Sequence, residues 1–523
     1  MKKQLFSLLI ILFTGLSFCT AQVTFQKSYG GAFPEWGNAV RQTTDGGYII
    51  AAANMSSNWR SYLIRTNING DLLWTKTFIW WPENGRDVQQ TFDGGFILLR
   101  NYYPDSQIAP LLKTDASGDT LWTMFYNFPN EIEGLVHVGG YSIQQTTDSG
   151  YIIAGLEGVK YYLAQFSQNS NAFLMKTNPS GHVVWAKSYG GLKNDAVFSV
   201  QQTTDNGYIM TGYETSFGID SADVYLVKTD AGGDTLWTRR YGGTRNESGT
   251  NVKQTSDNGY IIVGSTNSFG AGGNDIYLIK TDSNGNILWS KTYGGPGNDN
   301  ASGVQITSNG GFIISGSTMS FGTNNIFLIE TDNLGNIVWS KVFGGANPSS
   351  VEKTADGGYV ITGQVINNAD INVLLIKTDH AGNSGCNETD ATFINNNAAT
   401  KMSGTSTVVA SISVTASKVL NSVDSEGTAT TLCTTVGLNE IKSSLPLLIS
   451  PNPSSGDFVI TFPGIINQGT VEIYTVLGAR VFSKAIFLST NIEVNLQNNS
   501  PGIYYVKVLD GERRYSQKIL IEK

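Results

Sequence analysis

A tryptophan recurs through most of this chain at an interval close to 50 residues. It lies in the second half of one short pattern, for example NDIYLIKTDSNGNILWSKTYGG between Asn274 and Gly295. In this pattern two alternating apolar runs flank a polar Asp-Ser-Asn-Gly turn, which is typical of a β-hairpin. A period of this length indicates a repeat architecture and constrains the fold more than any other feature. The tryptophans are Trp74, Trp122, Trp185, Trp237, Trp289 and Trp339.

A second landmark, an Asp-Gly-Gly-Tyr turn or a close variant, precedes each tryptophan and occurs once more after the last. In each copy an apolar run leads into this turn and another leads out, and a variable loop and the tryptophan hairpin follow. Each copy therefore predicts four strands, A to D, with tight A–B and C–D turns in which Gly and Asn supply positive φ. The seven copies are Asp45–Tyr48, Asp93–Phe96, Asp148–Tyr151, Asp205–Tyr208, Asp257–Tyr260, Asn309–Phe312 and Asp356–Tyr359.

Seven such copies predict an all-β fold, a seven-bladed β-propeller over residues 22–386, because a lone four-stranded sheet cannot bury both its faces. The ends of the array favour a closed ring over an open solenoid. The seventh copy carries Cys386 where a tryptophan is expected. The stretch VTFQKSYGG near the N-terminus is an isolated D strand with Phe25 at that same position. We therefore expect the N-terminal strand to complete the last blade.

The net charge argues against nucleic-acid binding, and the first residues predict export. The net charge is −8, whereas nucleic-acid binding needs Lys and Arg to neutralise phosphates, so we expect no nucleic-acid partner. Lys2 and Lys3 precede an apolar run that ends in small side chains, which predicts a secretory signal peptide over residues 1–21. After its removal no stretch is long and apolar enough to serve as a transmembrane segment.

The variable B–C and D–A loops emerge on one face of a propeller, and loops on a rigid scaffold often carry function. In copies one to three these loops are rich in aromatic side chains. Flat rings beside amide and carboxylate groups are suited to stack on sugars or to hold an extended peptide. The alternative is that the rings pack their own loops against the blades. The candidate ligand-binding residues are Trp36, Trp80, Trp81, Tyr102, Tyr103, Tyr161 and Tyr162.

A catalytic reading has less support, and we assign no catalytic residue. Of the three histidines, His182 and His380 fall in C–D turns, away from the variable loops. A glycosidase needs only two carboxylates, so Asp105, Glu131 and Glu133 keep a polysaccharide-active enzyme open as an alternative. A passive structural surface protein is a third alternative.

Metal and cysteine chemistry are sparse. The loop GPGNDN offers Asn298 and Asp299 to calcium, but it lacks the dense D-x-D spacing of strong sites. No Cys/His cluster is present, so we expect no metal and no other cofactor. Cys386 and Cys433 are the cysteines left after signal removal, and two cysteines in an exported chain favour a disulfide.

The amino-acid composition changes after Cys386. Residues 387–446 are rich in Ser, Thr, Asn and Ala and contain no Trp or Tyr. This composition predicts an extended, solvated linker, in part β-stranded. From residue 447 to 523 alternating apolar residues return, and they suit a small β-sandwich.

The C-terminal module resembles the type A C-terminal sorting domain of type IX secretion systems, with several motifs in the family's order. The resemblance implies Sec export and then passage through an outer-membrane translocon, the type IX secretion machinery, which reads the folded tail. The chain as a whole predicts a secreted or cell-surface propeller, a non-catalytic binding or adhesion module for glycan or protein. The residues that carry the resemblance are Pro451, Asn452, Pro453, Gly456, Leu477, Gly478, Pro501, Gly502 and Tyr504.

Overall fold

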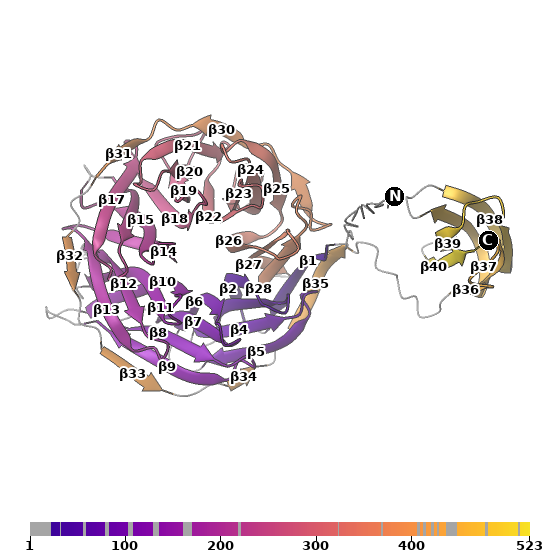
Figure 1. Ribbon diagram of the computed structural model, residues 1–523, viewed down its shortest axis with the longest axis horizontal. Coiled ribbons are helices and arrows are strands. Elements are labelled where there is room, and N and C mark those ends of the chain that lie inside the picture. Colours follow the sequence, from indigo (N-terminus) through magenta and orange to yellow (C-terminus); the bar gives the residue numbers. More distant parts are fainter. Residues whose placement is uncertain are drawn as a thin grey trace, which may run out of the picture. The chain divides into compact units, whose positions relative to one another are not determined.

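A computed structural model gives the structure of the protein (Figure 1). The chain divides into two compact units, Met1–Thr435 and Val436–Lys523. Every regular element of the described chain is a β-strand. The described residues contain no helix long and apolar enough to cross a membrane. They run from 22 to 522, except 32, 56–58, 79–82, 103–107, 129–134, 161–169, 218–220, 323, 368–369, 405–407, 412–414, 420–422, 426–427, 436–446, 476–479 and 511–512.

The first unit is the expected seven-bladed propeller, and each blade is an antiparallel sheet with its first strand at the centre of the ring (Figure 1). Blade 1 contains β2 (Glu35–Gln42), β3 (Tyr48–Asn54), β4 (Arg60–Thr66) and β5 (Leu72–Phe78). Blade 2 contains β6 (Glu83–Gln90), β7 (Phe96–Tyr102), β8 (Ile108–Thr114) and β9 (Thr120–Asn127). Blade 3 contains β10 (Leu135–Gln145), β11 (Tyr151–Lys160), β12 (Ser170–Thr177) and β13 (Val183–Gly190). Blade 4 contains β14 (Asp195–Gln202), β15 (Tyr208–Glu214), β16 (Asp223–Thr229) and β17 (Thr235–Gly242).

The remaining blades follow the same order. Blade 5 contains β18 (Glu247–Gln254), β19 (Tyr260–Thr266), β20 (Asp275–Thr281) and β21 (Ile287–Gly294). Blade 6 contains β22 (Asp299–Ile306), β23 (Phe312–Thr318), β24 (Asn325–Thr331) and β25 (Ile337–Phe343). Blade 7 contains β26 (Ala346–Lys353), β27 (Tyr359–Asn367) and β28 (Asp370–Thr378), and it takes its last strand from the N-terminus, β1 (Thr24–Gly30).

The N-terminal strand closes the ring, as the sequence predicts. β1 pairs antiparallel with β28, and Phe25 lies opposite Lys377. Phe25 is fully buried, and its ring centroid lies 6.0 Å from that of Tyr48 in blade 1. The joint between the last and the first blade is therefore made in the same way as the others.

Each repeated tryptophan packs between two blades. Trp185 of blade 3 lies against the C–D turn of blade 4, where a Cβ added to Gly233 would come within 2.7 Å of its ring. The same ring packs on Tyr208, with the centroids 5.9 Å apart. The hydroxyl of Tyr189 donates a hydrogen bond to the carbonyl of Gly233 over 2.6 Å. The tryptophan ring thus packs in the space that the turn glycine leaves by having no side chain, which explains why both residues recur.

The turn aspartates also have a structural role. Asp205 accepts a hydrogen bond from the Gly207 N–H over 3.0 Å and another from the Lys228 ammonium over 3.1 Å. In blade 6 Asn309 replaces the aspartate and Glu330 replaces the cation. There the ion pair is absent, and the Glu330 carboxylate accepts a hydrogen bond from the Tyr359 hydroxyl over 3.1 Å.

The segment after the propeller forms a belt around it. Residues 388–435, here named the belt, supply one short strand to the outer edge of every blade (Figure 1). It passes the blades in reverse chain order from blade 6 to blade 1 and ends on blade 7. Its strands are β29 (Glu388–Asp390) on β25, β30 (Ile394–Asn397) on β21, β31 (Lys401–Ser403) on β17, β32 (Val408–Ser411) on β13, β33 (Thr415–Val419) on β9, β34 (Val423–Ser425) on β5 and β35 (Thr428–Thr435) on β1.

The sequence predicts a solvated, in part β-stranded linker over residues 387–446, and the structure shows that its strands pair with the blades. An outer strand presents free N–H and C=O groups, and a passing segment of almost any composition can pair with them. Apolar side chains also anchor the belt: Phe393 is 4% exposed, and its ring lies 4.8 Å from Phe321 and 5.4 Å from Phe327. Residues 436–446 lie outside the described residues.

A disulfide lies where the belt starts. Cys386, just ahead of the belt, is disulfide-bonded. Gln26 of β1 donates to the carbonyl of Cys386 over 2.5 Å and pairs in register with Cys433 of β35. The residue just ahead of the belt and the last strand of the belt therefore both contact β1 of blade 7. The pairing of Cys386 with Cys433 stays a prediction that this arrangement favours.

The second unit is a strongly curved sheet around its own apolar core. Its strands are β36 (Leu448–Ser450), β37 (Asp457–Thr475), β38 (Arg480–Asn495), β39 (Gly502–Asp510) and β40 (Arg513–Ile521). The order is β36-β37-β39-β40, and β38 also pairs with β37. The core includes Val471, Ile473, Val506 and Ile519, all fully buried.

Candidate functional site

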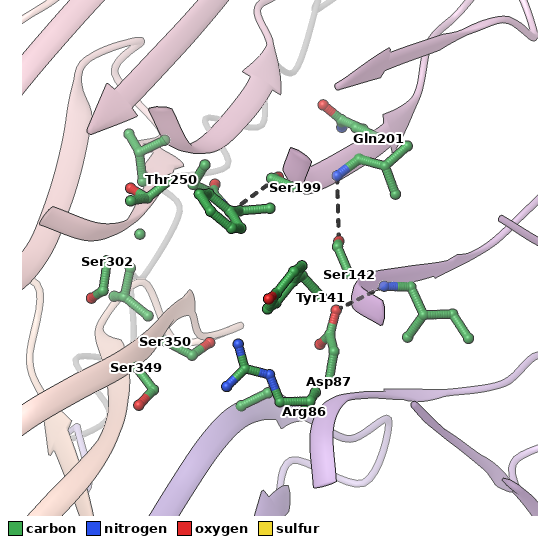
Figure 2. A pocket seen from close by; sticks show the side chains of 18 of the residues that line it. Arg86, Asp87, Tyr141, Ser142, Ser199, Gln201, Thr250, Ser302, Ser349 and Ser350 are labelled. Atoms are coloured by element: carbon green, nitrogen blue, oxygen red, sulfur yellow. Dashed lines mark hydrogen bonds between the residues drawn. The ribbon is translucent and has the colours of Figure 1, made fainter. Parts of the chain in front are cut away.

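A polar pocket of about 370 Å³ lies at the centre of the propeller, lined by the first strand of every blade (Figure 2). This volume falls in the usual range for small-ligand sites. Because all seven blades contribute side chains, the pocket exists only in the closed ring.

In blades 1 to 6 a β-bulge in the first strand brings an additional side chain to the pocket, and in blade 7 a longer irregularity between Ala346 and Ser350 takes its place. In blade 2, for example, the pairing of β6 with β7 shifts between Gly85 and Asp87, and Arg86 is the additional residue. Bulges re-aim single side chains in this way and are frequent beside functional sites. The pocket residues at this position are Asn38, Arg86, Tyr141, Phe198, Thr250, Ser302 and Ser349.

A second set of pocket residues lies three positions further along these strands, and glutamine dominates it. Their amide oxygens bond the neighbouring blade: the Gln145 N–H donates to Gln89 over 2.9 Å, and the Gln202 N–H donates to Gln144 over 2.6 Å. Gln201 accepts in the same way from the Gln254 N–H over 2.7 Å. The pocket residues at this position are Arg41, Gln89, Gln144, Gln201, Lys253 and Gln305.

The charged groups of the pocket are unevenly paired. Arg41 forms ion pairs with Asp87 over 2.8 Å and with Glu352 over 3.5 Å. Arg86 lies over the ring of Tyr141, with its guanidinium carbon 5.0 Å from the ring centroid (Figure 2). Within the described part of the chain, neither Arg86 nor Lys253 has an ion-pair or hydrogen-bond partner.

The pKa values of the three pocket cations reflect whether each cation has a carboxylate partner. Burial lowers the pKa of Lys253, and the nearby Arg41 cation lowers it further. Burial also lowers the pKa of Arg86. For Arg41, burial lowers the pKa, but Asp87 and Glu352 outweigh it and leave the pKa above its usual value. For Lys253 and Arg86, the carboxylates of the protein thus do not offset the cost of burying the positive charge.

A ring of buried carboxylates at the start of the first strands holds the loops of one face. Asp195 accepts from the Gly191 N–H over 2.8 Å and from the Ser216 hydroxyl over 2.5 Å, which ties a D–A loop to a B–C loop. Burial raises the pKa of Glu35 to about 7, and it also raises that of Asp275, at the start of β20, to about 6. In three blades the N–H of the second glycine of the Tyr-Gly-Gly motif donates to an acid of this ring, namely Asp195, Glu247 or Asp299, which gives that glycine a structural role.

The suggested calcium ligands belong to this ring. One carboxylate oxygen of Asp299 accepts from the Gly295 N–H over 2.9 Å and from the Ser320 hydroxyl over 2.7 Å. The other oxygen has no hydrogen-bond partner among the described residues. The amide oxygen of Asn298 accepts from the Asn274 N–H over 2.9 Å. The described residues contain no group of three or more His, Cys, Asp or Glu placed to hold a metal.

Of the aromatic residues predicted to bind ligand, only the ring of Trp36 falls within the described residues. It stacks on Trp59, with the centroids 5.0 Å apart and the rings 14° from parallel, so one of its faces is covered by the protein. Tyr102 ends β7, but its side chain lies outside the described part. The others outside it are Trp80, Trp81, Tyr103, Tyr161 and Tyr162, together with the candidate acids Asp105, Glu131 and Glu133.

The residues that resemble a sorting motif shape one end of the second unit. The amide oxygen of Asn452, between Pro451 and Pro453, accepts from the Leu520 N–H over 3.0 Å. Gly456 has a φ of 112°, and a Cβ there would come within 2.8 Å of the backbone of Gln497. Near Pro501 and Gly502, the Tyr504 hydroxyl donates to the Ser500 carbonyl over 2.6 Å. Leu477 and Gly478 lie outside the described residues.

Comparison with known proteins assigns a family to the C-terminal module but assigns no function to the propeller. Residues 448–522 match the family model of the secretion system C-terminal sorting domain. The regulatory protein FlaEY of Caulobacter vibrioides is 27% identical over 206 residues, a match that spans 32% of this chain and 21% of that protein.

Solved structures with similar folds are distant. A puromycin hydrolase mutant complexed with PGG has 13% identity and a TM-score of 0.41, over 70% of this chain and 54% of that one. A eukaryotic initiation factor has 10% identity and a TM-score of 0.30, over 73% and 98%. A glycoside hydrolase of family 32 from Bifidobacterium adolescentis has 9% identity and a TM-score of 0.26, over 96% of each chain. These similarities assign neither an activity nor a ligand to this chain.

Proposed function

Residues 448–522 are a type IX secretion sorting domain, which directs the protein to the cell surface or the exterior, and from this premise we propose that its propeller is a non-catalytic glycan-binding module. The observation that carries the proposal is the central pocket. It is polar, of small-ligand size and built by all seven blades. Such an enclosed site suits the end of a glycan chain better than the surface of a folded protein.

The chemistry of the pocket supports a sugar ligand. Tyr141 and Phe198 bring their ring centroids to 5.1 Å, and both rings line the pocket. The hydroxyl of Ser142 and the amide of Gln201 line the same pocket (Figure 2). The amide of Gln144 also lines it. A sugar has an apolar face that packs on aromatic rings and hydroxyls that pair with amides and hydroxyls.

The state of the pocket carboxylate supports binding over catalysis. General acid–base catalysis needs a group placed to exchange a proton with the substrate. Asp87 instead uses one oxygen for the Arg41 guanidinium and the other for the Ile143 N–H over 3.1 Å. A polysaccharide-active enzyme stays the rival, and it predicts cleavage products.

A glycan array tests the proposal with the secreted mature protein. We expect binding to a defined set of glycans, and we expect Phe198→Ala to reduce that binding at least about tenfold because a pocket ring is lost. Phe92→Ala is the matched control: Phe92 is 72% exposed in a tight turn of blade 2, outside the pocket. The same incubations are assayed for new reducing ends.

Three results would overturn the proposal. One is an array with no bound glycan. Another is binding that Phe198→Ala leaves unchanged. The third is release of shortened glycans, which would establish the rival enzyme.

A further inference from the structure

The central pocket has more hydrogen-bond donors to offer than acceptors. The amide oxygens of Gln89, Gln144 and Gln201 are already used by backbone N–H groups of the neighbouring blade. Their amide nitrogens have no acceptor among the described residues. The free amide acceptors among the described pocket residues are the side-chain oxygens of Asn38, Asn251 and Gln305.

The unpaired cations add to this excess. Lys253 from blade 5 and Arg86 from blade 2 both line the pocket, and neither has an ion-pair or hydrogen-bond partner in the described chain. The two nearby carboxylates, Asp87 and Glu352, are both held by Arg41. Three cations therefore face two carboxylates, which leaves one positive charge.

We propose that the pocket recognises a glycan through a singly charged oxyanion, a carboxylate or a sulfate ester on the sugar, held by Lys253 and Arg86. This inference rests on the proposed glycan-binding function and names its ligand class. An oxyanion supplies only acceptors, so it matches the free amide and cationic donors of the pocket. One negative charge also completes the charge balance.

Water is the alternative occupant of these donors. Solvated cations would give an acidic sugar only a weak, salt-screened preference over its neutral counterpart. A bound oxyanion gains charge-assisted hydrogen bonds, which are about twice as strong as neutral ones. The preference between matched sugars therefore separates the two cases.

The experiment uses the mature protein on one array that carries glucose-, glucuronate- and glucose 6-sulfate-terminated versions of the same backbones. We expect a charged version to bind about tenfold or more tightly than its neutral partner, and added salt to weaken that preference. Preference for glucuronate identifies a carboxylate as the source of the charge, and preference for the sulfated version identifies a sulfate.

Variants then assign the preference to residues. Lys253→Gln keeps an amide like those of the neighbouring glutamines, so it should abolish most of the preference and leave neutral-sugar binding nearly unchanged. Arg86→Lys should retain more of the preference than Arg86→Gln, because it keeps the charge. Lys401→Gln, at an exposed belt position, is the matched control. Thermal unfolding checks folding, and Lys253→Gln should not lower the midpoint, since no ion pair or hydrogen bond is lost.

The outcomes separate this inference from the function beneath it. If neutral and charged glycans bind equally, or if Lys253→Gln keeps the preference, the oxyanion site is wrong and the binding module stands. If no glycan binds at all, the proposed function itself is wrong.

Discussion

The same seven repeats make the joints between blades and the central pocket. The residues at the joints are nearly the same in every repeat, whereas those in the pocket differ between repeats. At all seven joints an aromatic ring of one blade lies against a positive-φ glycine of the next, where an added Cβ would come within 2.4–2.9 Å of that ring. In the pocket the bulge position carries Asn, Arg, Tyr, Phe, Thr or Ser. The joints repeat because each must transmit the same geometry to close a ring. The pocket is free to vary because its side chains face solvent or a ligand.

This difference shows where to look for function in a repeat protein. A residue repeated seven times is needed by the architecture, since few ligands require seven copies of one group. The informative positions are those where the copies diverge within a fixed backbone. Arg86 and Lys253 are such positions, and both are unpaired in the described structure.

The largest effect is expected where the ring closes, because β1 completes blade 7 by pairing with β28, a strand that lies far from it in the sequence. Phe25→Ala removes a fully buried ring from the contact with Tyr48 and the turn at Gly70. We expect a loss of about 3–5 kcal/mol in the free energy of unfolding, measured by urea denaturation with tryptophan fluorescence.

Phe92→Ala is the control for this comparison, because its ring is largely exposed and the change should stay within about 0.5 kcal/mol. A loss below about 1 kcal/mol for Phe25→Ala would show that the seam does not depend on the repeated contact.

The second effect concerns the belt, which holds the blades from outside through backbone pairing. Cys386→Ser removes the disulfide at its start. Native disulfides typically contribute about 2–4 kcal/mol. We expect hydrogen exchange to rise in β29 and β35, while the inner strands keep their protection.

Reducing agent serves as the internal control. It should reproduce this exchange pattern in the wild type and add nothing to the variant. Cys433→Ser should match Cys386→Ser if these two residues are the pair. Unchanged protection of β35 in the variant would mean that backbone pairing alone holds the belt.

The blades were predictable from the sequence because their determinants are local and repeated. The turn glycines, the hairpins and the tryptophan lie at fixed spacing, and Phe25 marks the missing outer strand. The belt was not predictable, since it binds through backbone groups that any sequence carries, and its Ser and Thr content is equally typical of a solvated chain. Only Phe393 hints at burial, and a single aromatic residue is a weak signal.

The pocket was missed for a different reason. A regular strand alternates its side chains between two faces, and the bulge breaks this alternation at one residue such as Arg86. Aligning the seven copies would have exposed a column that holds six residue types in seven blades, with glycine before it in four of them. The loop aromatics drew attention instead, and among them only the ring of Trp36, stacked on Trp59, falls in the described structure.

The smallest expected effect is a difference in unfolding free energy between two glycine variants, and it measures one contact at a blade joint. Gly233 and Gly94 have nearly equal φ values, 80° and 83°. A Cβ on Gly233 meets the ring of Trp185 at 2.7 Å, whereas a Cβ on Gly94 meets nothing within 4 Å. Gly94→Ala should therefore cost only the backbone term, about 1 kcal/mol. Gly233→Ala should cost about 1–3 kcal/mol more, because the ring must shift. Urea denaturation of both variants measures the difference, and equal losses would mean that the joint tolerates displacement of its tryptophan.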